Sequence, residues 1–190
     1  MAGGLDANGM VLNLSEVKHA IRSEITEQLD FRFLNEAWPE FDVTSSEGCL
    51  PTTEALVRII WSRLANQLPL VALRLYESSG LWADYLGQTM DAYLTIRTHF
   101  AAAHRLARPE LSQEENELIY GKCARPHGHG HNYLVDVTVR GSIDPRTGMV
   151  CDLAALQRLV SDLVVEPFDH TFLNKDCLLY TSPSPRDVEE

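Results

Sequence analysis

The segment CARPHGHGHNY, residues 123–133, gathers one cysteine and three alternating histidines in a chain that has seven histidines and four cysteines. Imidazole and thiolate are typical zinc ligands, and a thiolate can also accept a proton. If His129 and His131 lie on a strand, both side chains point to one face, about 6 to 7 Å apart along the chain. Two imidazoles could then bind one metal ion together, and a third ligand must come from another part of the chain.

His104, in the segment FAAAHRL, is the natural third ligand. It ends the predicted strand that precedes the histidine cluster, so a hairpin would bring it beside the other two. Three imidazoles leave the fourth tetrahedral position of a zinc ion open, which is the arrangement of a catalytic site. His127 has the same parity as His129 and His131, so the spacing alone leaves open which two bind. The alternative is a glycine-rich loop that carries surface histidines.

Two further segments contain residues that could transfer protons. Cys123 lies close to Lys122 and Arg125, and positive neighbours favour the thiolate, which is the form that acts as a base. A structural cysteine is the alternative. In FDHTFLN, Asp169 adjoins His170, and the two could form a carboxylate–imidazole relay. Alternatively, Asp169 simply ends a helix.

The composition narrows the class of partner. With 190 residues and 45% hydrophobic content the chain can bury a core, and its net charge of -11 opposes binding to nucleic acid. No apolar stretch is long enough for a membrane span, and no basic-then-apolar leader is present at the N-terminus. The four cysteines are widely and irregularly spaced, which fits a reducing compartment. We therefore expect a cytoplasmic protein that binds a small molecule and has neither a nucleic-acid nor a membrane partner.

An internal repeat organises the chain. GMVLNLSEVKHAIRSEITEQLDFRFLNE from Gly9 aligns without gaps with GMVCDLAALQRLVSDLVVEPFDHTFLNK from Gly148. The two copies start 139 residues apart, and a period of 139 residues is the size of a domain. We therefore expect a tandem duplication in which the chain begins inside the first copy and stops inside the second. Phe31 stands where the second copy has His170, which suggests that only one of two sites is chemically competent.

The elements that must position these residues follow from the hydrophobic pattern. Apolar stripes behind Asn13 and Asp152 predict a helix in each copy, and both helices are expected to cover a sheet. A further helix, strands and a polar loop are predicted in between. The expected helix is within 51–68, the strands are 70–78, 81–87, 93–106 and 129–143, and the loop is 108–121. The sum is an α+β fold of antiparallel strand pairs with helices on one face.

Several segments together resemble one family. AAAHRL, EENELIYGKCARPHGHGHNY, VTVRGSIDPRTGMV, FDHTFLN, PTTEALVRIIW and LRLYES are similar to successive motifs of 6-pyruvoyl-tetrahydropterin synthase and its relative 6-carboxy-tetrahydropterin synthase. The resemblance covers nearly everything from Asp6 to Asp176. It implies the tunnelling fold, in which ββααββ units join their sheets into a barrel. It also implies a homo-oligomer formed through sheet-edge pairing, with sites between units.

The resemblance assigns roles to particular residues. It implies that the zinc ligands are His104, His129 and His131 and that the base is Cys123. It implies a proton relay formed by Asp169 and His170. It also implies that Glu77 anchors the pterin ring, with Thr52 and Thr53 beside it.

The implied activity is zinc-dependent conversion of 7,8-dihydroneopterin triphosphate to 6-pyruvoyl-tetrahydropterin, with elimination of triphosphate, as in tetrahydrobiopterin biosynthesis. One alternative is the 6-carboxy-tetrahydropterin synthase of queuosine biosynthesis. The other is a zinc-binding fragment without catalytic activity.

The order of the motifs departs from the family. We interpret residues 1–88 as the C-terminal part of a first synthase unit and residues 89–176 as the N-terminal part of a second one. The short junction GQTMDA should let the last strand of the first unit pair with the first strand of the second. The tail 177–190 is dense in serine and proline and resembles translated sequencing-adapter sequence, so we exclude it from the fold. A genuine disordered tail is the alternative.

Overall fold

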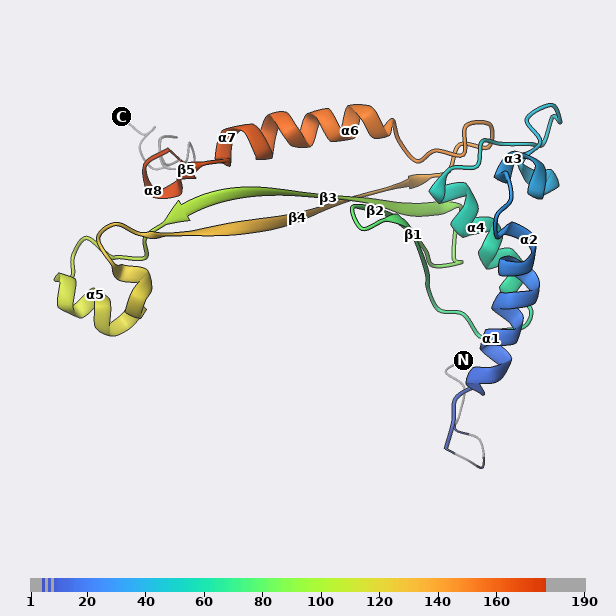
Figure 1. Ribbon diagram of the computed structural model, residues 1–190, viewed down its shortest axis with the longest axis horizontal. Helices are drawn as coiled ribbons and strands as arrows, with labels where there is room; N and C mark the ends of the chain where they lie inside the picture. Colours follow the sequence, from blue (N-terminus) through green and yellow to red (C-terminus); the bar gives the residue numbers. More distant parts are fainter. Residues whose placement is uncertain (1–4, 6, 8, 177–190) are drawn as a thin grey trace, which may run out of the picture. The chain divides into compact units, whose positions relative to one another are not determined.

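The computed structural model describes residue 5, residue 7 and residues 9–176, so the tail 177–190 lies outside the described residues. The helices are α1 (Leu14–Ile21), α2 (Glu27–Leu29), α3 (Leu34–Ala37), α4 (Thr53–Leu64), α5 (Gln113–Tyr120), α6 (Leu153–Val160), α7 (Glu166–Phe168) and α8 (Leu173–Asp176). The strands are β1 (Leu73–Ser78), β2 (Leu81–Tyr85), β3 (Asp91–His104), β4 (His129–Ser142) and β5 (Thr171–Phe172). Helices α1 to α4 come first along the chain, strands β1 to β3 follow, and shorter runs of helix and strand make up the rest (Figure 1).

The chain divides into two compact units. The first unit consists of the chain up to residue 96 together with 137–152, and the second consists of 97–136 together with the chain from 153 onward. Each of the two long strands, β3 and β4, contributes residues to both units. This division is based on contacts within the chain and does not show whether the two sequence copies arose by duplication. The predicted tandem duplication therefore stays a prediction.

Four strands form one sheet in the order β1-β2-β3-β4. β1 and β2 make an antiparallel hairpin, and β2 pairs antiparallel with β3 from Leu81 opposite Ile96 to Tyr85 opposite Ala92. β3 and β4 run in opposite directions (Figure 1). The pairing of β2 with β3 confirms the expected pairing of the strands on either side of the junction GQTMDA. The α+β class is also confirmed. β5 adds two residues in parallel beside the end of β3.

In the first unit, α4 covers one face of the sheet. Val57 of α4 is fully buried in one cluster with Ala83 and Ala92 from the strands, and Trp61 packs against this cluster. The helix begins as the sequence predicts, because the Thr52 hydroxyl accepts a hydrogen bond from Ala55 N–H at 3.1 Å and so caps the first turn. Alternate strand residues point to the other face of the sheet, and there they form cross-strand ion pairs, such as the one between Arg74 and Asp84 at 2.7 Å.

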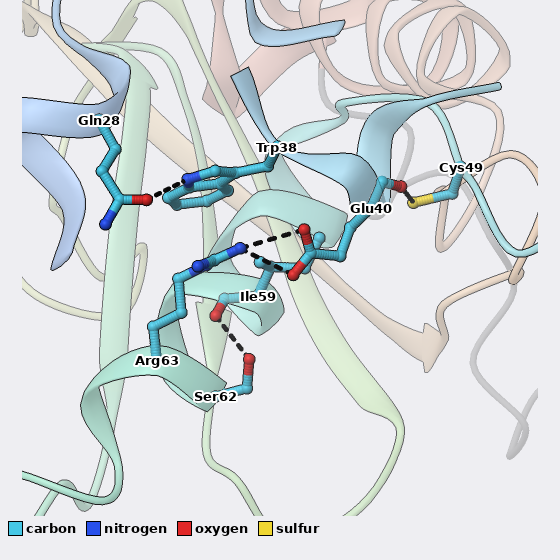
Figure 2. A network of polar contacts seen from close by, with 7 residues as sticks. All are labelled: Gln28, Trp38, Glu40, Cys49, Ile59, Ser62 and Arg63. Atoms are coloured by element: carbon cyan, nitrogen blue, oxygen red, sulfur yellow. Dashed lines mark hydrogen bonds and ion pairs between the residues drawn. The ribbon is translucent and has the colours of Figure 1, made fainter. Parts of the chain in front are cut away.

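A polar network in the first unit holds the segment after α3 onto α4 (Figure 2). The guanidinium of Arg63 lies 4.1 Å from the ring centre of Trp38 and donates to both carboxylate oxygens of Glu40, at 2.8 and 3.0 Å. Trp38 Nε1–H donates to Gln28 Oε1 at 2.8 Å, and Cys49 Sγ lies 3.7 Å from Glu40 O. These bonds give the Trp38 indole N–H and the Glu40 carboxylate partners, which lowers the cost of burying the loop, although Arg63 Nε is buried without a hydrogen-bond partner among the described residues.

The backbone conformation repeats with the same spacing as the sequence. A π-helical segment follows the first helix of each copy, Arg22–Thr26 and Ser161–Val165. The aligned residues Phe31 and His170 have φ angles of 56° and 57°, a left-handed conformation that side-chain-bearing residues adopt only at a cost. The two copies therefore share details of backbone conformation in addition to sequence.

Two sequence expectations are wrong in part. The predicted loop 108–121 contains helix α5, whose capping box joins Ser112 and Glu115 reciprocally. In the first copy, Leu14 and Ile21 of the apolar stripe are exposed and do not cover a sheet. The reason is that α1 packs against the α4 cluster through Ala20 and Val17, which leaves those two side chains on the outer side.

Among the described residues, no helix is long and apolar enough to cross a membrane.

Candidate metal centre

Three imidazoles come together where β3 ends and β4 begins. One ring nitrogen each from His104, His129 and His131 lies within 4.8 Å of the other two. The Nε2 atoms of His104 and His129 are 3.3 Å apart. Two ligand nitrogens bound at 2.0–2.1 Å to one tetrahedral ion would be about 3.3 Å apart. The separation therefore suits ligands of a shared metal ion.

The electrostatics of the cluster favour neutral rings. Burial lowers the pKa of His104 below its ordinary value, and the neighbouring His129 and His131 lower it further. A neutral imidazole is the form that offers a lone pair to a metal. His129 Nδ1 is buried and has no hydrogen-bond partner among the described residues. The donor set therefore fits a zinc ion, which favours imidazole nitrogen.

His127, which the spacing alone could not exclude, is exposed and does not belong to this group. Gly128 beside it has a φ of 66°, and a Cβ atom there would come within 2.6 Å of His104 O and of Phe172 Cε2. Only glycine combines that backbone angle with so close an approach. The sequence analysis passed over this glycine, although it allows the turn into β4 to pack directly against His104.

Cys123 lies in the 3₁₀ turn Gly121–Ala124 that follows α5. Its side chain is partly exposed, and its carbonyl accepts a hydrogen bond from Leu106 N–H at 2.8 Å. This bond ties the turn to the residues just after β3. Its role as a base stays a prediction.

Asp169 and His170 form a hydrogen-bonded pair in the second unit. His170 Nδ1 lies 2.9 Å from Asp169 Oδ2, while Asp169 Oδ1 accepts from Ala101 N–H at 2.8 Å. The bond from Ala101 and the bond to His170 both lower the pKa of the Asp169 carboxyl below its ordinary value. An ionised carboxylate holds the proton of His170 on Nδ1 and leaves Nε2 free to accept one.

One histidine of the three-imidazole cluster and the histidine of the Asp169–His170 pair line the same hollow. It has a volume of about 370 Å³ and is lined by His131 and His170, among others. The remaining lining residues are Ala101, Ala102, Ala103, Gly130, Asn132 and Thr171. A small ligand in this hollow can contact His131 and His170 together.

Thr52, Thr53 and Glu77 belong to the first unit. The Thr53 hydroxyl, which is buried, donates a short hydrogen bond to the Glu77 carboxylate. The Thr52 hydroxyl donates to Gly148 O. Glu77 and Thr53 are therefore hydrogen-bonded to each other, and Thr52 caps α4 and contacts the start of the second repeat. The roles of all three in substrate binding stay predictions.

Comparison with known proteins identifies the family. The family model described as 6-pyruvoyl tetrahydropterin synthase matches residues 1–88 and 93–187. The chain belongs to this family. The second match runs to residue 187 and so includes part of the tail that the sequence analysis set apart.

Individual relatives of the synthase family share about half of this chain. The 6-pyruvoyl tetrahydrobiopterin synthase of Poecilia reticulata is 52% identical over 84 residues, which are 44% of this chain and 57% of the relative. The enzyme of that name from Drosophila melanogaster is 44% identical over 104 residues, 55% of this chain and 61% of the relative. The chain thus spans about three fifths of these relatives. A solved structure of Caenorhabditis elegans 6-pyruvoyl tetrahydropterin synthase covers 50% of this chain and 67% of that one, with 41% identity and a TM-score of 0.44.

Proposed function

We propose that this chain carries the site of a zinc-dependent pterin synthase, which converts 7,8-dihydroneopterin triphosphate to 6-pyruvoyl-tetrahydropterin and eliminates triphosphate. The main support is that His131, one of three clustered imidazoles, lines the same hollow as His170. Membership of the synthase family gives that arrangement its reaction class. A cytoplasmic location is part of the proposal.

His104, His129 and His131 are the proposed zinc ligands. A zinc ion bound by three imidazoles supplies Lewis-acid chemistry, because it polarises a substrate oxygen and makes a neighbouring carbon-bound hydrogen easier to remove. The spacing of the Nε2 atoms and the neutral state favoured for His104 both support this assignment.

The proposed proton transfers use Cys123 and the Asp169–His170 pair. The Cys123 thiolate takes a proton from the side chain of the substrate as general base. His170 handles a second proton at Nε2, because its Nδ1 is engaged by Asp169. The proton removed beside the leaving group lets triphosphate depart with its bonding electron pair, and the protons taken from the side chain are returned to the ring, which is reduced as the side chain is oxidised.

Glu77 is the proposed anchor of the pterin ring. A carboxylate accepts hydrogen bonds in pairs from neighbouring N–H groups, such as those on the pyrimidine edge of a pterin. Thr53 supports this role because its hydroxyl donates to the carboxylate and so limits the rotamers of Glu77. Sites between units, as the resemblance implies, make assembly of a homo-oligomer through sheet edges part of this proposal.

We also propose that residues 1–88 and 89–176 are parts of two duplicated synthase units. The two separate family matches and the repeated π-helical segments and left-handed residues support this view.

The test is turnover by the full chain. Incubation of the zinc-loaded chain with 7,8-dihydroneopterin triphosphate should release triphosphate and give 6-pyruvoyl-tetrahydropterin. Cys123→Ala should abolish release but keep the bound metal. A 6-carboxy product would instead favour the queuosine-type alternative. Bound zinc without any release would favour the inactive fragment.

A further inference from the structure

Asn174 makes two hydrogen bonds to the backbone of one residue. Its Oδ1 accepts from Arg105 N–H at 2.7 Å, and its Nδ2 donates to Arg105 O at 2.9 Å. Arg105 directly follows the proposed metal ligand His104, where β3 has ended. The side chain of Asn174 thus replaces the partner strand that the backbone lacks at this point.

The segment that contains Asn174 also holds the residues of β3 that directly precede His104. Five residues earlier, Asp169 Oδ1 accepts from Ala101 N–H at 2.8 Å, and β5 pairs with Ala102 and Ala103 in between. Strand ends fray when their backbone groups have no partners. With these contacts the backbone is held both before and after His104.

The side chain of Arg105 anchors this residue to α5 and to the turn that follows it. Its Nε donates to Ala124 O at 3.0 Å, and its second guanidinium nitrogen donates to Gln113 Oε1 at 2.6 Å. Ala124 and Gln113 belong to the turn after α5 and to α5 itself. Arg105, which directly follows His104, is therefore held by Asn174 through its backbone and by Ala124 and Gln113 through its side chain.

The first copy provides an internal control. Asn35 aligns with Asn174 in the shared Phe-Leu-Asn motif, and both residues lie in a single helical turn, α3 or α8. Among the described residues, however, the Asn35 side chain makes no hydrogen bond to the backbone of a strand. The same residue in the same local fold thus occurs once with hydrogen bonds to the residue after the proposed metal ligand and once without such bonds.

We infer that Asn174 is a positioning residue for the metal site, which fixes His104 so that its imidazole meets those of His129 and His131. The inference rests on the proposed zinc site. Residues that orient metal ligands typically change metal affinity by about 10- to 100-fold when they are removed. Loss of the Asn174 amide should have an effect of that size, although Asn174 itself touches no metal.

The experiment compares Asn174→Ala with Asn35→Ala in the full chain. Zn²⁺ affinity is measured by competition with a chromophoric chelator, the d–d spectrum is recorded with Co²⁺, and amide exchange is followed at Arg105. Asn174→Ala should accelerate exchange at Arg105, weaken Zn²⁺ binding about 10- to 100-fold and alter the Co²⁺ spectrum. Asn35→Ala should leave all three unchanged.

The outcomes separate the two proposals. If Asn174→Ala accelerates exchange but binds Zn²⁺ as tightly as the parent, the positioning role is wrong and the zinc site stands. If Asn35→Ala weakens Zn²⁺ binding to the same degree, the effect is one of general stability and the inference fails. A parent chain that binds neither metal, with slow exchange at Arg105, would overturn the zinc site and with it this inference.

Discussion

At the scale of single residues, the chemistry of the second unit depends on side chains that hold one another in defined states. The Asp169 carboxylate joins two elements, because one oxygen binds the backbone of β3 and the other binds His170. The cluster of three imidazoles likewise depends on His104 being neutral, which burial and the two other rings favour.

The lowered pKa of Asp169 predicts an acid dependence of stability. Its folded-state pKa lies below the unfolded value of about 3.9, so its contribution is complete above that pH and is lost as pH falls through the lower folded value. Asp169→Asn removes the charge, and its free energy of unfolding should depend less steeply on pH below about 4 than that of the parent. Chemical denaturation of the metal-free chain at several pH values measures this slope.

Asp30→Asn is the matched control, since Asp30 occupies the aligned position in the first copy. Its pH profile should follow that of the parent, because the Asp30 side chain makes no hydrogen bond to the backbone of a strand among the described residues. Equal flattening in both variants would contradict the assigned contacts.

The sequence identified most of these residues and missed others for a clear reason. His104, His129 and His131 could be predicted because imidazole spacing on a strand is regular. Asn174 and Gly128 were missed because their roles come from contacts between segments distant in sequence. The repeat held a hint about Asn174, since both copies retain the asparagine.

At the scale of elements, two strands and the turns at their ends build the site. β3 delivers His104 at its last residue and β4 delivers His129 at its first, so the connection between them decides whether the rings meet. Gly128 is the tightest point of that connection.

Gly128→Ala and Gly121→Ala form a matched pair. Both glycines have positive φ, of 66° and 58°, but a Cβ atom clashes only at Gly128. Gly121→Ala should cost about 1–3 kcal/mol from backbone strain, because φ 58° with ψ -132° is a conformation that essentially only glycine adopts. Gly128→Ala should cost roughly 1–3 kcal/mol more from overpacking and should also weaken metal binding, because the His104 backbone must move.

Urea denaturation and a zinc titration of both variants check this pair. If Gly128→Ala is no less stable than Gly121→Ala and binds zinc like the parent, the close approach to His104 does not constrain the site.

The elements themselves were largely predictable. The helices after Asn13 and Thr52 follow from apolar stripes behind capping residues, and the strands follow from alternation. α5 was missed because its charged sequence lacks a strong apolar stripe, although Ser112 and Glu115 have the spacing of a capping box. The exposure of Leu14 could not be predicted, because the stripe does not reveal which neighbour a helix meets.

At the scale of the whole molecule, the chain contains one segment twice, from Gly9 and from Gly148. β2 and β3 lie on either side of the short junction and pair directly, as the sequence predicts. The family could be recognised from motifs in shifted order, whereas the division into two compact units depends on contacts that no local pattern encodes.

The most direct test of this account is calorimetric titration of the metal-free chain with Zn²⁺, in the parent, His104→Ala and His127→Ala. We expect one ion per chain in the parent and in His127→Ala. In His104→Ala, loss of a direct ligand should weaken binding by more than about 100-fold, which exceeds the usual effect of an outer residue. No binding by the parent, or equal binding by His104→Ala, would contradict a shared metal site of three imidazoles.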